Sequence, residues 1–135
     1  ADLVLVLDAP LDEAECAAVA TRPGLVVIGT VDDDRLHGAA LLLPATNMAE
    51  ENGTYLNRDH RAQRYFQAKP APGMARPAWW IASQAVAVRT GSAPNTAAEA
   101  FAQLGGSVPA LAGLTYSDLG HTGRVVSGAP AGAGR

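Results

Sequence analysis

The stretch LVLVLDAPLDEAECAAVATRPGLVVI, residues 3–28, contains two short aliphatic runs joined by a segment with helical signals. Runs 3–7 and 25–28 consist of Leu, Val and Ile without interruption, which is typical of strands buried on both faces of a parallel sheet. Segment 11–22 opens with acidic residues and ends on Arg22, so its charges favour a helix whose dipole they complement. Strand, helix and strand in this order predict a βαβ unit.

A third aliphatic run, residues 39–44, ends at Pro44 and predicts another strand of the same sheet. An acidic turn at residues 32–34 separates it from the second run. The three runs and the helix therefore predict an α/β fold with a mostly parallel sheet. Two further β-prone stretches, 54–57 and 61–66, follow an Asn-Gly pair and predict a hairpin or an irregular excursion.

Two helices are predicted in the C-terminal half of the chain. Segment 75–91 has Pro77 near its start and Gly91 at its end, the positions that these residues favour around a helix. Segment 96–104 begins at Thr96 and has a glutamate three residues later, which is the pattern of a capping box.

Composition indicates a small domain with a thin core. The chain has 135 residues and a mass of 13.8 kDa, and 28 of its residues are alanine. We expect such a domain to be marginally stable alone and to depend on contacts with a neighbour. The first residue is Ala and a strand-like run begins at residue 3, so we expect a fragment of a longer protein. We expect a single α/β domain at residues 1–126 and a disordered Gly/Ala/Pro-rich tail at residues 127–135.

Charge and cysteine content exclude several classes of protein. The net charge is −3, and the basic stretch 58–76 is interpreted as a solvated face or a contact with an acidic partner, not a nucleic-acid site. A single cysteine, Cys16, excludes an internal disulfide and a zinc or iron–sulfur site built on cysteines. No apolar run reaches the roughly 18 residues that span a bilayer, so no membrane insertion is expected.

The ends of the predicted strands are the first candidates for chemistry. Asp8 and Pro10 follow the first strand, where ligands bind in parallel sheets, but no glycine-rich phosphate loop accompanies them. The acidic turn lacks the spacing of a Ca²⁺ loop and is interpreted as solvated, and the histidines form no metal-binding pair. The residues concerned are Asp32, Asp33, Asp34, His37, His60 and His121.

One cysteine, two glutamates and two tryptophans are interpreted as structural residues. Cys16 lies in an Ala-rich helix and is expected to pack as a small hydrophobe. Glu50 and Glu51 are adjacent, so they point in different directions and make a poor acid–base pair. Trp79 and Trp80 lie about 100° apart on a helix, so one is expected to fill the core. The other is either partly exposed or an anchor for another domain. We assign no catalytic, cofactor-binding or metal-binding residue to this chain.

A series of motifs occupies residues 41–81. They are Leu43-Pro44, Glu50-Glu51, Gly53-Thr54-Tyr55-Leu56-Asn57, Asp59-His60-Arg61-Ala62-Gln63 and Pro72-Gly73-Met74-Ala75-Arg76-Pro77-Ala78-Trp79. In this order they resemble the C-terminal region of the molybdopterin oxidoreductase superfamily. Asp59-His60 departs from the Glu-Gly of that family, at a tight turn that normally needs glycine.

Within the superfamily the chain looks most similar to the large iron–sulfur subunit of NADH:quinone oxidoreductase, respiratory complex I. Residues 106–120, GSVPALAGLTYSDLG, resemble the ending of that subunit. The resemblance implies a small Rossmann-like three-layer domain that is structural and non-catalytic and supports electron transfer from NADH to quinone. It implies no cofactor in this fragment, because the iron–sulfur clusters belong to the missing N-terminal part of the subunit.

The same resemblance implies partners and a location. The partners are the remaining domains of the same subunit and the neighbouring peripheral-arm subunits, and nucleic acid is not among them. The location is the cytoplasmic face of a bacterial cell membrane, as a peripheral part of a membrane complex.

Two alternatives stay open. The first is the molybdopterin-binding domain of a formate dehydrogenase or nitrate reductase type oxidoreductase, with the metal ligand in upstream sequence. The second is a free-standing α/β interaction or nucleotide-binding module, which depends only on the strand–helix–strand opening.

Overall fold

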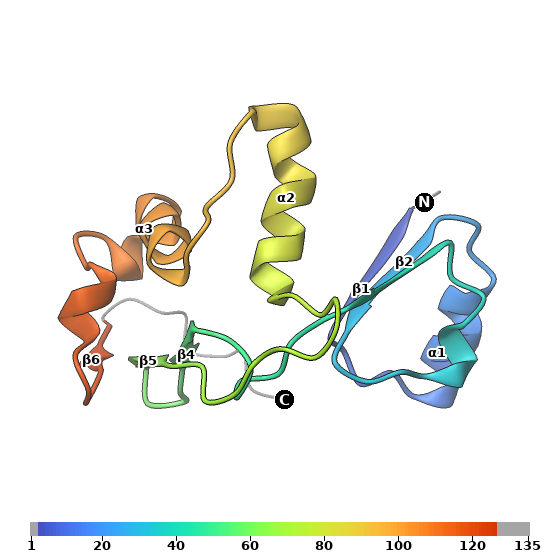
Figure 1. Cartoon of the computed structure of the whole chain (residues 1–135), viewed down its shortest axis with the longest axis horizontal. Helices are drawn as coiled ribbons and strands as arrows, with labels where there is room; N and C mark the ends of the chain where they lie inside the picture. Colours follow the sequence, from blue (N-terminus) through green and yellow to red (C-terminus); the bar gives the residue numbers. More distant parts are fainter. Residues whose placement is uncertain (1–2, 127–135) are drawn as a thin grey trace.

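The structure, a computed structural model, describes residues 3–126 and contains two three-stranded sheets (Figure 1). The first is parallel, in the order β1-β2-β3, and consists of β1 (Val4–Leu7), β2 (Leu25–Gly29) and β3 (Leu41–Pro44). Helix α1 (Glu13–Ala20) connects β1 to β2. The predicted α/β class and parallel sheet are confirmed. The tail at residues 127–135, for which disorder was predicted, lies outside the described residues.

Helix α1 begins with reciprocal capping. The Asp12 carboxylate accepts the backbone N–H of Glu15 at 2.8 Å, and the Glu15 carboxylate accepts that of Asp12 at 2.9 Å. The helix ends at Ala20, so the prediction that it extends to Arg22 is wrong, and its last turn contains no basic residue. Pro23 explains the early end, because the residue before a proline is disfavoured in the helical conformation.

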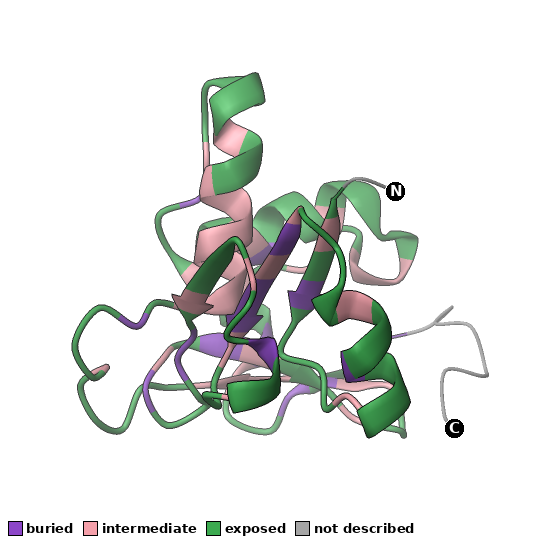
Figure 2. Ribbon diagram, turned by 90° about the vertical axis from the view of Figure 1, so that its right-hand side faces the viewer, coloured by how far each residue is buried: buried purple, intermediate pink, exposed green. Residues whose placement is uncertain are grey.

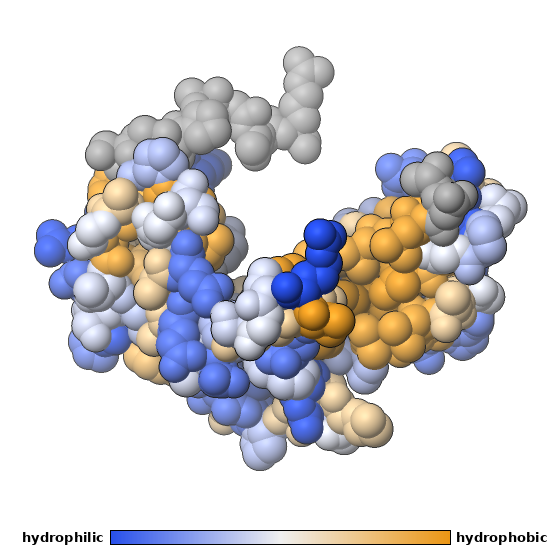
Figure 3. All heavy atoms as spheres, turned by 90° about the horizontal axis from the view of Figure 1, so that it is seen from above, coloured by the Kyte–Doolittle hydropathy of each residue, from blue (hydrophilic) through white to orange (hydrophobic). Residues whose placement is uncertain are grey.

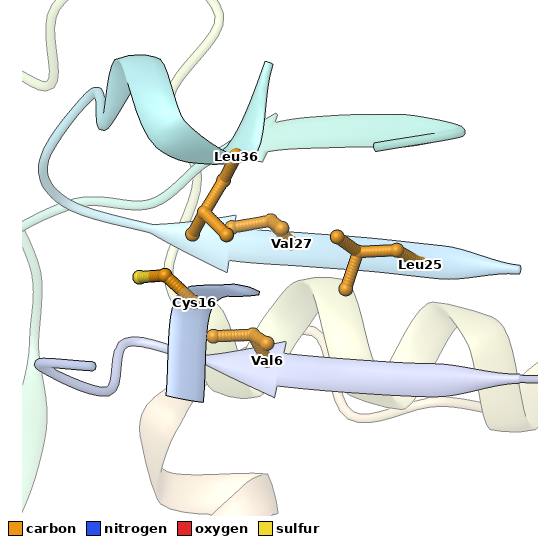
Figure 4. Close-up of a cluster of buried hydrophobic side chains, with 5 residues drawn as sticks. All are labelled: Val6, Cys16, Leu25, Val27 and Leu36. Atoms are coloured by element: carbon orange, nitrogen blue, oxygen red, sulfur yellow. The ribbon is translucent and has the colours of Figure 1, made fainter. Parts of the chain in front are cut away.

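One face of the parallel sheet is covered by α1 and by the short helix η1 (Asp34–Leu36). The buried cluster on this face consists of Val6, Cys16, Leu25, Val27 and Leu36 (Figure 4). Cys16 is 3% exposed, which confirms that it packs as a small hydrophobe. On the opposite face Leu5, Leu7 and Leu41 are exposed. Ile28 lies on this same face and is only 3% exposed, so the face is open in part.

The second sheet is antiparallel, in the order β4-β5-β6. Strands β4 (Gly53–Leu56) and β5 (Arg61–Tyr65) form the predicted hairpin, and β6 (Arg124–Val125) adds a strand that the sequence did not predict. A separate buried cluster lies here and consists of Ala62, Phe101, Leu119 and Val126. The described residues thus contain two hydrophobic clusters, one for each sheet.

The hairpin turn keeps its tight geometry without a glycine. His60 has a φ of 57°, in the left-handed region that favours glycine. The Asn57 side chain stabilises the turn, because its Oδ1 accepts the backbone N–H groups of Asp59 and Arg61, each at 2.9 Å. The turn that the family pattern places at Glu-Gly is therefore formed by Asp59-His60.

Helices α2 (Ala78–Thr90) and α3 (Ala97–Ser107) confirm the two predicted C-terminal helices, and η2 (Pro109–Leu111) and η3 (Tyr116–Leu119) follow. Helix α2 ends at Gly91, whose φ of 77° forms a left-handed cap. None of its 13 residues is buried, and Figure 2 shows its distal turns as mostly exposed. No helix within residues 3–126 is long and apolar enough to cross a membrane.

Helix α3 is capped differently from the prediction. The Thr96 hydroxyl accepts the backbone N–H of Glu99 at 3.1 Å, which is the expected half of a capping box. The Glu99 carboxylate accepts the N–H of Asn95 at 2.7 Å instead of that of Thr96. The glutamate therefore reaches one residue further back than the capping-box pattern requires.

Candidate functional site

The parallel sheet ends in a cleft at the carboxyl ends of β2 and β3, where ligands bind in many α/β folds. The cleft has a volume of about 860 Å³ and is walled by the loop after β2, the end of β3 and residues 72–75. A smaller cleft of about 350 Å³ at the end of β1 includes Asp8 and Pro10. The predicted position of these two residues is confirmed, and this edge of the sheet is the candidate site.

Asp8 binds the neighbouring strand end. Its Oδ1 accepts the backbone N–H of Thr30 at 2.9 Å and the Thr30 hydroxyl at 2.8 Å. The backbone N–H of Asp8 donates to the carbonyl of Ile28 at 2.7 Å. Asp8 has a φ of 43°, a conformation that aspartate tolerates better than most residues. Asp8 therefore joins β1 to the loop after β2.

The aspartates of the acidic turn pair with Arg35 and His37 of the same turn. Arg35 donates to both oxygens of Asp33, and its shortest contact is 2.6 Å. The Nε2 of His37 lies 2.7 Å from Asp32 and 3.7 Å from Asp34. The pKa of His37 is raised because Asp32 hydrogen-bonds to its ring, and Arg35 lowers the pKa of Asp33. Within residues 3–126 no three potential metal ligands come together.

Glu50 is a buried carboxylate on the wall of the larger cleft. Its Oε1 lies 2.9 Å from the Nζ of Lys69, and its Oε2 accepts the backbone N–H of Asn47 at 3.2 Å. Lys69 is the main reason why the pKa of Glu50 is lowered. Because the buried charge is paired, this contact holds the loop after β3 against the segment that carries Lys69.

Glu51 points to different partners, as predicted for adjacent carboxylates. It accepts the hydroxyl of Thr46 at 2.5 Å and that of Tyr65 at 2.7 Å. Burial and the hydrogen bond to Glu51 raise the pKa of Tyr65. Since Thr46 follows β3 and Tyr65 ends β5, Glu51 links the two sheets and does not form an acid–base pair with Glu50.

The basic stretch 58–76 is largely committed to contacts within the chain. Arg61 donates to the carbonyl of Thr122 at 3.2 Å, and Arg64 donates to that of Gly120 at 2.9 Å. Arg61 and Arg64 therefore have partners within the chain, and the interpretation of the stretch as a solvated or partner-binding face stays a prediction. Both guanidinium groups satisfy carbonyls just after η3.

Neither tryptophan fills a core. Trp79 and Trp80 are both half-buried and belong to neither hydrophobic cluster, so the prediction that one of them packs in the core is wrong. The indole Nε1 of Trp79 is buried and has no hydrogen-bond partner among the described residues. Both residues lie in the first turn of α2.

A family model described as molybdopterin oxidoreductase matches residues 7–108, which include the cleft and the residues that wall it. The chain belongs to the molybdopterin oxidoreductase family. The resemblance found in residues 41–81 is confirmed at this level.

The chain is similar to formate dehydrogenases. It is 39% identical over 83 residues to the putative formate dehydrogenase YrhE of Bacillus subtilis (strain 168), a match that covers 60% of this chain and 8% of the relative. It is 36% identical over 89 residues to the alpha subunit of F420-dependent formate dehydrogenase 2 of Methanococcus maripaludis. This match covers 63% of this chain and 13% of the relative. These relatives support the superfamily and do not support complex I specifically.

The charged side chains at the sheet edge determine whether this chain could bind the pyrophosphate of a molybdopterin dinucleotide. A pyrophosphate needs free cations or a cradle of backbone N–H groups. The cations at this edge already bind carboxylates: Arg35 binds Asp33, and Lys69 binds Glu50. Neither of these two cations is therefore free for the pyrophosphate of such a cofactor, and we derive no step through it.

Proposed function

We propose that this chain is a non-catalytic α/β part of the large subunit of a formate-dehydrogenase-type molybdopterin oxidoreductase. The observation that carries the proposal is the family match over residues 7–108 together with relatives that are named formate dehydrogenases. The chain spans only 8 to 13% of the length of these relatives. In this proposal the molybdopterin and the ligand of its metal are held by other parts of the subunit.

The contacts at the sheet edge support a structural role for these residues. Asp8 joins two strand ends, Glu50 binds Lys69, and Glu51 links β5 to the loop after β3. Each of these carboxylates stabilises the position of a loop, and none is aimed at an open cavity without a partner. We infer that this region gives the subunit its shape around a cofactor that other residues bind.

Formate oxidation tests the proposal. The full-length protein that contains this chain, purified without air and given formate and a viologen dye, is expected to reduce the dye. Omission of formate is the control. A protein that carries its full complement of metal and shows no formate-dependent reduction would contradict the proposal.

The complex I subunit is the second candidate, and residues 106–120 are the observation that favours it. These residues include the end of α3, η2 and η3, and most of them lie beyond the family match, which ends at residue 108. In that case the chain would be located at the cytoplasmic face of the membrane, with the peripheral-arm subunits as partners. Purification of the protein from membranes together with NADH:quinone reductase activity would favour this candidate over formate dehydrogenase.

A further inference from the structure

We infer that Asn52 is the site at which this chain undergoes deamidation, and that the fold around it slows the reaction. Asn52 is followed by Gly53, and the pair is the only Asn-Gly sequence in the chain. Deamidation is the loss of the side-chain amide of an asparagine as ammonia, which leaves aspartate or isoaspartate. The inference concerns the chemical lifetime of the protein and does not depend on the proposed function.

The reaction needs only water and the two residues of the pair. The backbone nitrogen of Gly53 gives up its proton to water and attacks Cγ, the side-chain carbonyl carbon of Asn52. The new N–Cγ bond closes a cyclic succinimide, and the bond from Cγ to Nδ2 breaks, so that the amide takes up a proton and leaves as ammonia. Water then adds to a carbonyl group of the ring and opens it. Glycine favours the attack because it has no Cβ to obstruct the approach.

Separate structural needs place these two residues side by side. Gly53 lies against Tyr65, its register partner in β5, and a Cβ at position 53 would overlap the Tyr65 ring. Asn52 supplies a hydrogen-bond acceptor, because its Oδ1 accepts the backbone N–H of Gln67 at 3.0 Å. The chain therefore contains a labile sequence in which each residue makes a contact of its own.

The folded structure opposes the attack at both residues. Asn52 is exposed, so access of water does not limit the reaction. The hydrogen bond from Gln67 fixes the Asn52 side chain, whereas ring closure requires this side chain to rotate. Gly53 belongs to β4, and its carbonyl accepts the Tyr116 hydroxyl at 3.1 Å. The backbone of Gly53 is therefore fixed as well, and its nitrogen has little freedom to approach Cγ.

The loop that carries Asn52 is also held against the segment after β5. The carbonyl of Ala49 accepts the backbone N–H groups of Ala68 at 2.8 Å and of Lys69 at 3.0 Å. The buried Glu50 carboxylate lies 2.9 Å from the Nζ of Lys69. Because these contacts hold the loop in place, the reactive conformation requires a local opening of the structure. The rate of deamidation then follows the population of the opened loop.

The isoaspartate product is expected to loosen the connection between the two sheets. It adds a methylene group to the main chain at position 52, directly before the strand in which Gly53 opposes Tyr65. The same position follows Glu51, whose carboxylate accepts the Tyr65 hydroxyl at 2.7 Å. The longer backbone disrupts both contacts and so destabilises the β4–β5 hairpin.

Mass spectrometry of the aged full-length protein tests the inference. The protein is incubated at mildly alkaline pH in buffer or in urea, digested with trypsin, and the peptide of residues 36–58 is sequenced. Asn47 and Asn57 lie in the same peptide and are internal controls, because neither precedes a glycine. We expect deamidation at Asn52 in both samples, at least about 10-fold more slowly in the native protein than in urea.

Lys69→Gln tests whether the loop contacts control the rate. The variant removes the partner of Glu50 and should speed deamidation of the native protein at least about 3-fold, with no change in urea. Arg89→Gln is the matched control, because it removes an exposed cation from the end of α2. An unchanged native rate in Lys69→Gln would show that these contacts do not protect Asn52.

Other outcomes would also overturn the inference. Equal rates in buffer and in urea would show that the fold does not protect Asn52. Preferential reaction of Asn47 or Asn57, or an unmodified Asn52 in urea, would refute the assignment of the site. If Lys69→Gln does not fold, the wild-type comparison still decides between protection and its absence. The isoaspartate form should unfold at a lower urea concentration than fresh protein, and equal midpoints would contradict the effect on the hairpin.

Discussion

Gly53 lies directly against the phenol of Tyr65, its register partner across the β4–β5 hairpin, and a Cβ at position 53 would overlap the ring. The ring cannot simply move aside, because Glu51 accepts the Tyr65 hydroxyl at 2.7 Å. Glycine is therefore required at position 53 for a packing reason, since its φ is not in the left-handed region.

Gly53→Ala is expected to destabilise the protein by about 1–3 kcal/mol, the usual cost of an added methyl group in a packed site. Urea unfolding of the purified protein measures the change. Gly38→Ala is the matched control, because a Cβ there meets no atom within 4 Å. Equal effects of the two substitutions would contradict the contact.

Asp8→Ala is expected to lower the free energy of unfolding by about 1–2 kcal/mol, because it removes both hydrogen bonds to Thr30. Asp8→Asn should cost less, since the amide oxygen still accepts and asparagine tolerates a φ of 43°. Asp34→Ala, at a fully solvated position of the acidic turn, is the control. An alanine variant as stable as the wild type would show that Asp8 does not join the strand ends.

His60→Gly is expected to stabilise the protein by roughly 0.5–1 kcal/mol. Relief of the left-handed conformation gains about 1–2 kcal/mol, and the greater freedom of glycine in the unfolded chain offsets part of it. His60→Ala, which keeps the strain, should not stabilise. Thermal unfolding of the three proteins compares them, and a glycine variant that melts below the wild type would contradict the assigned turn.

The His37–Asp32 pair predicts a decrease in stability on the alkaline side of neutrality. Asp32 raises the pKa of His37 above its ordinary value of 6.5. Because the folded pKa is the higher one, the stabilisation is complete below pH 6.5 and is lost as the pH rises through the folded pKa. Urea midpoints between pH 5.5 and 8.5 should therefore fall less steeply for His37→Gln than for the wild type. Parallel curves would show that the pair contributes nothing.

The local elements were predictable from the sequence, and the contacts between them were not. Uninterrupted Leu and Val runs predicted β1, β2 and β3, because a strand covered on both faces has no polar alternation. Strand β6 carries no such signal, since it has two residues and pairs with β5, which lies far away in the sequence. The contact between Asp8 and Thr30 could not be predicted either, because it depends on the order of the strands in the sheet.

At the candidate site, too, the sequence predicted some properties of the side chains and not their contact partners. Adjacency alone predicted that Glu50 and Glu51 point to different partners, but nothing in the sequence identified Lys69 as the partner of Glu50. The tryptophans were mispredicted because helical spacing fixes the angle between two side chains and does not show whether anything packs against the helix. In α2 none of the residues is buried.

The metal content of the full-length protein tests the central proposal most directly. Elemental analysis of protein purified without air should give molybdenum or tungsten at about one atom per chain if the subunit is of the formate dehydrogenase type. Iron without either metal, in protein from cells supplied with both, would contradict that assignment and favour the complex I subunit.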